Sequence, residues 1–367
     1  MNLDATVSTP RLVIDVEKLD RNIESMAARL KESGIAQRPH FKTSKMIEVA
    51  ARQLRAGAAG LTCATPAEVD ALLKAGVDDI FWAHAPVHPR KAGLAASFNT
   101  RGKVSIGVDS LDVARIVSVA ASEIEEVVPV RIEIDTGLRR TGVEPDSALE
   151  LVEKVKALPF LTFEGLYTHE GQLASLTGSR TDLKRQGHVA SRILVQTAEL
   201  LRSAGHDVDV VSVGSTPGWD SAPFEPGVTE ARAGTYVFFD ANQCRLGSAD
   251  TPFCALTVHA TVISTVRPGN VVIDAGIKAM SSDGSNRGSS FGVVIDETGI
   301  PIDGISFARA YEEHGILEGS PTDTSQWRVG DRVRIIPNHA CGAVNMWSSA
   351  VAIGSNSVEN WDIVGRY

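Results

Sequence analysis

Short apolar runs alternate with amphipathic stretches from residue 12 to about residue 240. After an opening run at Leu12–Val16, the candidate strands are Arg38–Lys42, Gly60–Ala64, Asp79–Ala83, Lys103–Val108, Val130–Ile134, Leu161–Thr168, Val208–Val213 and Ala231–Phe239. Apolar positions at helical spacing lie in the segments between them, at Leu19–Leu30, Thr65–Ala75, Ser110–Ala121, Asp146–Ala157 and Lys184–Ala204. This alternation predicts an α/β fold, a parallel (β/α)8 TIM barrel. An open doubly wound sheet is the alternative, although no GxGxxG follows the first strand.

The pattern changes near residue 240. Closely spaced strand candidates with little helical periodicity follow, at Leu256–Val266, Asn270–Asp274, Gly292–Ile295, Asp331–Ile336 and Ser348–Ile353. Glycine-rich loops and the turn at Arg267-Pro268-Gly269 separate them. We therefore predict a barrel domain over residues 8–240 and a smaller antiparallel β domain over residues 241–367, with residues 1–7 as a candidate addition to the second.

Composition and charge exclude several classes of protein. With 43% hydrophobic and 22% charged residues and a net charge of −9, neither a disordered chain nor a nucleic-acid-binding protein is favoured. The first residues lack the charged and apolar segments of a signal peptide, and no run approaches about 18 apolar residues, so we expect a cytoplasmic protein without a membrane partner. Four cysteines, at 63, 244, 254 and 341, form no CxxC pair and are too sparse for a disulfide framework; three are expected as buried small hydrophobes.

Lys42 is the candidate for the chemistry. It ends a short apolar run just before a predicted helix, within Arg38-Pro39-His40-Phe41-Lys42. A lysine at a barrel strand end can condense with an aldehyde cofactor when burial or a neighbouring cation lowers its pKa. A solvated loop lysine is the competing interpretation.

Further motifs occur along the rest of the chain. They are Asp135–Gly142 (DTGLRRTG), Thr168–Gly171 (THEG), Gly214–Pro217 (GSTP) and Asn338–Cys341 (NHAC). Together with Arg-Pro-His-x-Lys, and in this order, they resemble the D-threonine aldolase and D-serine dehydratase family of pyridoxal phosphate (PLP) enzymes. The resemblance covers essentially the whole chain and implies the alanine-racemase-like fold, a barrel followed by a β domain.

The resemblance also implies a set of cofactor-binding residues. Lys42 would bond the PLP aldehyde, Arg140 would lie near the phenolic oxygen, His169 against the ring and Arg232 opposite the pyridine nitrogen. Catalytic roles fall to Lys42, His40 and His169, and the remaining cofactor contacts to Gly214, Ser215, Thr216, Gly234, Thr235 and Tyr236. Without the resemblance, Gly214–Thr216 could be an ordinary loop and Arg140 a surface arginine in a turn. His169 could likewise be a core histidine and Arg232 a solvated arginine.

His339 and Cys341 are the candidate metal ligands. An imidazole and a thiolate two residues apart in an extended loop can reach one divalent ion, and this mixed pair suits zinc better than manganese or magnesium. Relatives differ here, because some have aspartate at the position of Cys341. They often have histidine where this chain has Ser44, which leaves proton transfer and substrate open. His314 also matches the family, with a turn histidine as its alternative.

The resemblance therefore implies a PLP- and divalent-metal-dependent lyase that acts on D-3-hydroxy amino acids. β-Elimination to a keto acid and ammonia, as in a D-serine or D-threonine dehydratase, is the main prediction. Retro-aldol cleavage to glycine and an aldehyde, as in D-threonine aldolase, is the first alternative. Amino-acid racemisation and a non-catalytic PLP-binding protein are the further ones. By analogy with this fold we expect a homodimer.

Overall fold

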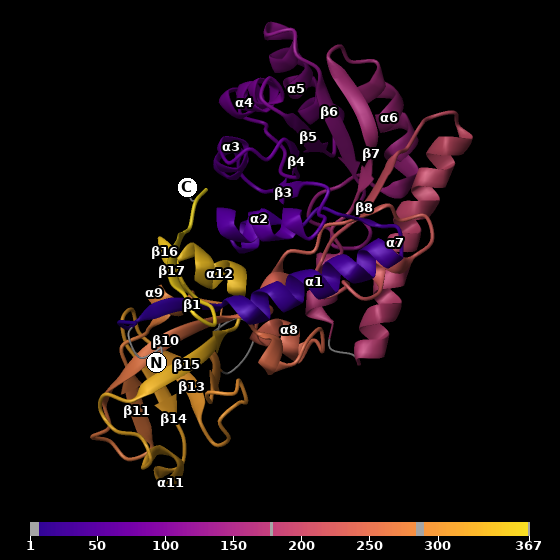
Figure 1. Ribbon diagram of the computed structural model, residues 1–367. Coiled ribbons are helices and arrows are strands. Elements are labelled where there is room, and N and C mark those ends of the chain that lie inside the picture. Colours follow the sequence, from indigo (N-terminus) through magenta and orange to yellow (C-terminus); the bar gives the residue numbers. More distant parts are fainter. Residues whose placement is uncertain (1–6, 177–178, 284–289, 366–367) are drawn as a thin grey trace. The chain divides into compact units, whose positions relative to one another are not determined.

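The computed structural model describes residues 7–176, 179–283 and 290–365 (Figure 1). The chain divides into two compact units. One consists of Met1–Ile23 with Thr235–Ile363, and the other of Glu24–Gly234 with Val364–Tyr367. The division into a cofactor-binding domain over residues 8–240 and a metal-binding domain over residues 241–367 stays a prediction.

The unit formed mainly by Glu24–Gly234 is a parallel barrel, as predicted. Its eight strands follow the order β2-β9-β8-β7-β6-β5-β4-β3, and every named pair is parallel. A parallel bridge between His40 and Thr62 joins the two ends of this order. The strands are β2 (Ala36–Gln37), β3 (Leu61–Cys63), β4 (Asp79–Trp82), β5 (Lys103–Val108), β6 (Val128–Glu133), β7 (Leu161–Tyr167), β8 (Val210–Val213) and β9 (Glu230–Ala231).

Helices connect consecutive barrel strands and supply much of the core. Several begin at a side-chain cap that the sequence displays: Thr65 accepts a hydrogen bond from the amide of Glu68, and Ser179 forms a capping box with Asp182. The helices are α1 (Val16–Glu32), which begins in the other unit, α2 (Ile47–Arg55), α3 (Pro66–Lys74), α4 (Pro89–Asn99), α5 (Leu111–Glu123), α6 (Ala148–Lys156) and α7 (Arg180–Ser203). Within the described part of the chain, no helix combines the length and apolar character needed to cross a bilayer.

Charged side chains are buried among these barrel strands. Glu230 pairs with Arg38 and Arg131, with nitrogen to oxygen distances of 2.7 Å in both cases, and Arg131 also lies 3.0 Å from Glu164. Burial alone would raise the pKa of Glu230, but Arg131 and Arg38 outweigh it and lower that pKa to about 2. The interior of this barrel is therefore held by a paired ionic network as well as by apolar packing.

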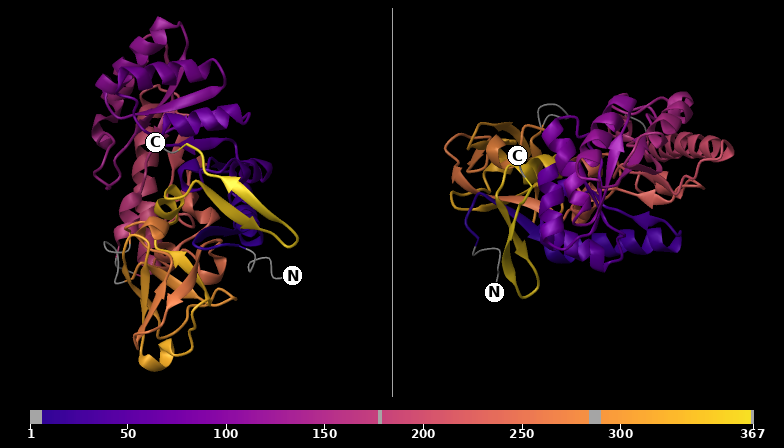
Figure 2. Two further views of the ribbon diagram at one scale, coloured as in Figure 1. Left: turned by 90° about the vertical axis from the view of Figure 1, so that its left-hand side faces the viewer. Right: turned by 90° about the horizontal axis from the view of Figure 1, so that it is seen from above.

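The other unit is built on a mostly antiparallel sheet, as predicted. Its strands follow the order β13-β14-β11-β10-β1-β16-β17, with β15 also on β10 and β12 on β15. Figure 2 shows the last two strands, in yellow, as a hairpin. The strands are β1 (Arg11–Asp15), β10 (Leu256–Ser264), β11 (Asn270–Ile273), β12 (Gly292–Ile295), β13 (Ser306–Ala310), β14 (Gly315–Glu318), β15 (Arg332–Pro337), β16 (Ser349–Ile353) and β17 (Val358–Asp362). Its short helices are α8 (Ala241–Arg245), α9 (Ile277–Met280), α11 (Pro321–Thr324) and α12 (Ala340–Asn345).

Three local predictions were wrong. No strand covers Arg38–Lys42, because β2 ends at Gln37 and Phe41–Thr43 form a 3₁₀ helix. Pro39 lacks the amide that a ladder needs. The strand expected over Ala231–Phe239 ends at Ala231, so Gly234, Thr235 and Tyr236 follow it. His339 and Cys341 do not share an extended loop, because His339 precedes α12 and Cys341 lies within that helix.

Candidate functional site

Lys42 lies in the 3₁₀ helix Phe41–Thr43, just after β2. His40 begins this helix, and its Nδ1 accepts a hydrogen bond of 3.4 Å from the amide of Lys42. The chain thus turns immediately after the strand and carries Lys42 out of the hydrogen-bonded ladder. Ser44 is buried and ends the same helix.

The two histidines predicted near Lys42 are neutral. Burial, followed by the charges of Lys42 and Arg232, holds the pKa of His40 well below its usual range. Burial and Lys42 lower the pKa of His169 to about 3, although a hydrogen bond to Gly214 opposes this. Nδ1 of His169 contacts the carbonyl oxygen of Gly214, and since that oxygen can only accept, Nδ1 carries the proton and Nε2 carries none. The structure therefore brings Lys42, His40, His169 and Arg232 into one electrostatic neighbourhood.

The loop Gly214–Thr216 follows β8, and some of its polar groups are hydrogen-bonded whereas one buried hydroxyl has no partner among the described residues. The amide of Gly214 donates to Oε2 of Glu170 at 3.1 Å, and Oγ of Ser215 accepts from the amide of Gly218 at 3.2 Å. The Thr216 hydroxyl is buried without a hydrogen-bond partner among the described residues. A buried hydroxyl in that state calls for an acceptor or donor from outside the chain, so Thr216 fits a phosphate-binding residue.

Two glycines allow close approach of the backbone around this loop. A Cβ on Gly214 would lie 2.7 Å from Cβ of Arg232, and a Cβ on Gly234 would lie 2.7 Å from Oγ1 of Thr43. Both positions would clash with any larger residue. The predicted cofactor residues Gly214 and Gly234 are therefore required by packing, whatever they bind.

Arg232 is buried, so its interpretation as a solvated arginine was wrong. Its Nε donates to Oγ of Ser212 at 2.8 Å, and that hydroxyl donates to Oε1 of Glu230 at 2.7 Å. A second guanidinium nitrogen contacts the carbonyl oxygen of Thr168. Burial lowers the pKa of Arg232, and the charge of Glu230 is the largest influence that opposes this. The guanidinium is thereby fixed in the barrel by the strands on either side.

Arg140 lies in the turn after β6 and is 56% exposed, with Nη2 at 4.0 Å from Oε1 of Glu133. Burial raises the pKa of Glu133, against the hydrogen bonds and positive charges around it. Tyr167 donates its hydroxyl to the same carboxylate at 3.2 Å. Arg140 therefore keeps the freedom to reach a ligand, while its neighbour Glu133 is held in place.

Thr235 and Tyr236 belong to the unit that also contains the predicted metal ligands. Tyr236 is buried, and Oγ1 of Thr235 lies 3.7 Å from Sγ of Cys341. The segment from Gly234 to Tyr236 therefore begins at the end of the barrel unit and continues into the sheet unit.

His339 is held between a carboxylate and a thiol. Its Nδ1 lies 3.3 Å from Oδ2 of Asp240, which also accepts a 2.9 Å hydrogen bond from the amide of Ala340. Burial opposes a charged imidazole, but Cys341, which is hydrogen-bonded to His339, and Asp240 outweigh it and raise the pKa of His339. Nδ1 is turned to Asp240 and the ring also lies beside Cys341, and an imidazole next to a sulfur fits the donor set of a zinc ion.

The metal candidate stays a pair of ligands. No group of three or more histidine, cysteine or acidic side chains suited to a metal occurs in residues 7–176, 179–283 and 290–365. His314 is exposed in the turn between β13 and β14, where its carbonyl oxygen accepts from the amide of Tyr311.

Asp240 and Glu170 are the site residues that sequence reasoning missed. Asp240 is fully buried and caps α8 through Oδ1, which accepts from the amide of Gln243 at 2.9 Å. Its place three residues before a glutamine is a helix-start signal, and nothing in that signal points to His339. Glu170 lies inside the THEG motif, but its bond to Gly214 joins two motifs 44 residues apart.

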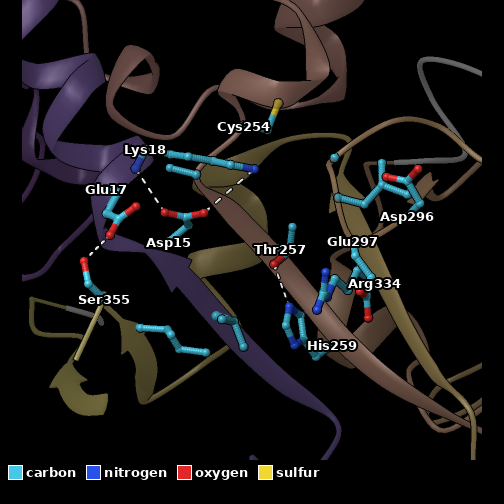
Figure 3. A pocket seen from close by; sticks show the side chains of 16 residues that line it. Asp15, Glu17, Lys18, Cys254, Thr257, His259, Asp296, Glu297, Arg334 and Ser355 are labelled. Carbon is cyan, nitrogen blue, oxygen red and sulfur yellow. Dashed lines mark hydrogen bonds and ion pairs between the residues drawn. The ribbon is translucent and has the colours of Figure 1, made fainter. Parts of the chain in front are cut away.

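A separate cavity of about 330 Å³ lies in the sheet unit and contains none of the predicted site residues (Figure 3). Asp15, Lys18 and Ser355 lie on one side of it in the figure, and His259 and Arg334 on the other. Cys254 also lines it.

Comparison with known proteins identifies both segments of the chain. Residues 14–242 match the alanine racemase N-terminal domain, and residues 255–353 match a serine dehydratase domain. The chain is 36% identical to D-threo-3-hydroxyaspartate dehydratase of Delftia sp. (strain HT23), over 97% of each chain. It is 31% identical to D-threonine aldolase of Arthrobacter sp, over 99% of this chain and 93% of that one, and 28% identical to D-serine dehydratase of Dictyostelium discoideum, over 96% and 94%.

Solved structures agree with these relatives. The structure of the Delftia dehydratase aligns with a TM-score of 0.92 at 35% identity over 99% of both chains, and a mutant of that enzyme in a metal-free form aligns with a TM-score of 0.93. Relatives named as dehydratases and aldolases are lyases, and an alanine-racemase-like family implies PLP. The chain therefore belongs to the D-threonine aldolase and D-serine dehydratase family of lyases, with the alanine-racemase-like fold.

Proposed function

We propose that this protein is a PLP- and divalent-metal-dependent lyase that removes the 3-hydroxyl group of D-3-hydroxy amino acids and yields a keto acid and ammonia. The relatives named as dehydratases of D-threo-3-hydroxyaspartate and D-serine support the reaction class and the D configuration. The observation that carries the proposal is the imidazole of His339, whose Nδ1 is turned to Asp240 and whose ring also lies beside Cys341.

The barrel residues would hold the cofactor. Thr216, whose buried hydroxyl has no partner among the described residues, would bind its phosphate, and the exposed Arg140 would approach its phenolic oxygen. PLP supplies a carbonyl carbon for the amino group and a conjugated ring that accepts electron density from Cα. Lys42 would be the residue bonded to it.

Arg232 would set the electronic state of the ring. Its guanidinium is buried and tied to Ser212 and Thr168, so it presents a fixed donor that does not give up its proton at neutral pH. If Arg232 faces the pyridine nitrogen, this donor would keep that nitrogen unprotonated and would weaken the electron sink that PLP supplies. This suits a reaction in which loss of the Cα proton is followed at once by departure of a leaving group.

Lys42 would also be the base that accepts the proton from Cα of the substrate. His40 and His169 lie in the electrostatic surroundings of Lys42 and are neutral, so neither adds a positive charge beside it. Unprotonated Nε2 of His169 also remains able to accept a hydrogen bond. These two histidines would thus hold the polar surroundings of Lys42 without competing for its proton.

His339 and Cys341 would hold the divalent ion, and the sulfur ligand favours zinc over manganese or magnesium. A divalent ion supplies positive charge that makes the substrate hydroxyl a better leaving group. Asp240 would orient the ring of His339 through Nδ1. The solved metal-free form of the related dehydratase agrees with a metal in that enzyme.

The decisive experiment is product analysis with the purified protein. D-serine, D-threonine, D-threo-3-hydroxyaspartate and their L counterparts would be incubated with PLP and zinc, with and without chelator. We expect keto acid and ammonia from the D compounds alone, and loss of product in the chelated samples. A Lys42→Ala variant is the matched control for background chemistry.

The alternative is retro-aldol cleavage, which the 31% identity to D-threonine aldolase supports. The same residues would then serve a different step, in which a base takes the hydroxyl proton and the Cα–Cβ bond breaks. Glycine and an aldehyde in the product analysis, without keto acid, would establish this alternative. A racemised substrate without either product would point to racemisation.

We propose a homodimer as the assembly, by analogy with other PLP enzymes of this fold. Sedimentation of the loaded protein tests this directly, and a fully active monomer would contradict it. The cytoplasmic location stays a prediction.

A further inference from the structure

Two of the four cysteines are neighbours in space although no sequence motif joins them. Sγ of Cys244 lies 3.5 Å from Sγ of Cys254, and both residues belong to the sheet unit. Cys244 is partly exposed on α8, whereas Cys254 is 2% exposed between the 3₁₀ helix Thr251–Phe253 and β10. The prediction that three cysteines are buried small hydrophobes therefore holds for Cys63 and Cys254 and is wrong for Cys244.

The backbone on both sides of this pair is well fixed. The amide of Cys244 donates to the carbonyl oxygen of Asp240 at 3.0 Å, and the amide of Cys254 donates to that of Thr251 at 3.0 Å. A disulfide needs a sulfur to sulfur distance of about 2.05 Å, so the two atoms have to approach by about 1.5 Å. The two sulfur atoms are thus already in contact before any bond forms.

We propose that Cys244 and Cys254 form a redox-reactive pair, which a small peroxide joins as a reversible disulfide. The partly exposed Cys244 sulfur attacks one oxygen of hydrogen peroxide, breaks the O–O bond and becomes a sulfenic acid while water leaves. The Cys254 sulfur then attacks Sγ of Cys244, loses its proton and expels the second water. Two thiols and one peroxide give one disulfide and two waters, so the two electrons lost by sulfur are gained by the peroxide.

The position of Cys244 connects the pair to the proposed metal site. Asp240 caps α8, the helix of Cys244, through Oδ1, and its Oδ2 receives Ala340 and His339. Drawing Cys244 toward Cys254 acts on a helix of only five residues whose cap orients His339. Oxidation of the pair therefore weakens metal binding, a consequence that rests on the proposed function.

Peptide mapping tests the disulfide itself. The reduced protein would be treated with stoichiometric hydrogen peroxide, alkylated, digested and examined by mass spectrometry. We expect peptides containing Cys244 and Cys254 joined with the loss of two hydrogen atoms, and their separation by dithiothreitol. Cys63→Ser should leave the link intact, and Cys254→Ser should abolish it. Full alkylation of both cysteines after treatment, or sulfinic acid at Cys244 without any link, would overturn the proposal.

Zinc competition with a coloured chelator tests the connection. The comparison uses oxidised protein in which Cys341 can still be fully alkylated. This protein should bind zinc about tenfold more weakly than reduced protein. A tenfold loss is the lower end of the range expected when a metal ligand loses its hydrogen-bonding partner. Cys244→Ser should show no such change, and His339→Ala sets the background. Equal affinities in the two states would overturn the connection. Absence of zinc binding by the reduced protein would instead count against the proposed function, because the mapping needs neither metal nor substrate.

Discussion

Lys45 and Lys278 are the lysines against which the assignment of Lys42 can be checked, and a carboxylate holds each of them. Lys45 is buried, with Nζ at 3.2 Å from Glu68 and 3.0 Å from the carbonyl oxygen of Gly365. Lys278 is half exposed and pairs with Glu313 at 2.9 Å. An amine held by a carboxylate has to leave that partner before it can bond the aldehyde of a cofactor.

We therefore predict that borohydride reduction of the PLP-loaded protein, followed by peptide mapping, places the pyridoxyl group on Lys42. Lys42→Ala should lose the label, and Lys45→Ala should retain it as far as that protein folds. Labelling of Lys45 or Lys278 in the unaltered protein would refute the assignment.

Asp240 has two tasks that a single substitution can separate. One oxygen caps α8, and the other accepts from Ala340 and His339. In Asp240→Asn the amide oxygen can still cap the helix, because asparagine is as good a cap as aspartate. The side-chain amide nitrogen is itself a donor, however, and it would face the donors of Ala340 and His339. His339 therefore loses its acceptor.

We expect Asp240→Asn to weaken zinc binding about 10- to 100-fold, as for other outer partners of a metal ligand, while the circular dichroism spectrum stays unchanged. Chelator competition measures the affinity. Unchanged affinity would show that Asp240 serves the helix alone.

His169 gives a prediction about pH. Its pKa is about 3 in the folded protein, whereas histidine in an unfolded chain titrates near about 6.5. Between these values the unfolded chain binds a proton that the folded chain does not, so the free energy of unfolding falls as the pH falls. The contribution is fully present above pH 6.5 and is lost toward pH 3.

Urea unfolding of the apoprotein should therefore show a steeper loss of stability between pH 6.5 and pH 4.5 than the His169→Gln variant shows. The difference should approach about 2 kcal/mol, since one pKa unit corresponds to about 1.4 kcal/mol. Glu133 and Glu170 contribute equally to both proteins and cancel in the comparison. Parallel pH profiles would mean that His169 titrates normally.

The elements that could be predicted are those whose pattern is local. Lys103–Val108 and Gly292–Ile295 are strands over the predicted residues, because an apolar run with clear polar ends is bounded by its own sequence. Lys42 and His339 were placed in the wrong elements because short 3₁₀ and α-turns depend on one proline or one cap. The contact of Asp240 with His339 joins residues 99 positions apart, and no local pattern encodes it.

The same limit applies to the ionic network between barrel strands. Glu230 on β9 faces Arg38 after β2 and Arg131 on β6, and all three are buried. In the sequence, Arg38 and Glu230 look like ordinary polar residues at strand ends, and Arg131 looks like a polar residue within a strand. Removing the central carboxylate breaks two buried ion pairs at once, and leaves Arg131 with Glu164 and Arg38 with Asp79 as the remaining acidic partners.

Glu230→Gln should therefore lower the free energy of unfolding by about 3–5 kcal/mol, the usual cost of breaking a buried ion pair. Glu150→Gln is the matched control, because Glu150 pairs with Lys154 on the exposed face of α6 and should change stability little. Equal effects of the two substitutions in urea unfolding would contradict the role given to the buried network.

The candidate residues are divided between the two compact units. Lys42, Arg140, His169 and Arg232 belong to the barrel unit, and His339, Cys341 and Asp240 to the sheet unit. Each unit has its own sheet and its own buried core. Most candidate cofactor residues thus lie in one unit and the metal ligands in the other, although Thr235 and Tyr236 share the unit of the metal ligands. We therefore expect cofactor binding to change little when the metal is removed.

Removal of the metal from the loaded protein tests this separation. Exhaustive chelation should lower turnover of D-3-hydroxy amino acids about a hundredfold or more, because the ion is expected to supply several kcal/mol of charge stabilisation to the departing hydroxyl. The visible absorbance of bound PLP should stay nearly constant, since the barrel residues that would hold it do not include His339 or Cys341. Added zinc should restore turnover, but not in Cys341→Ala. Full turnover in protein shown to contain no metal would remove the ion from the reaction.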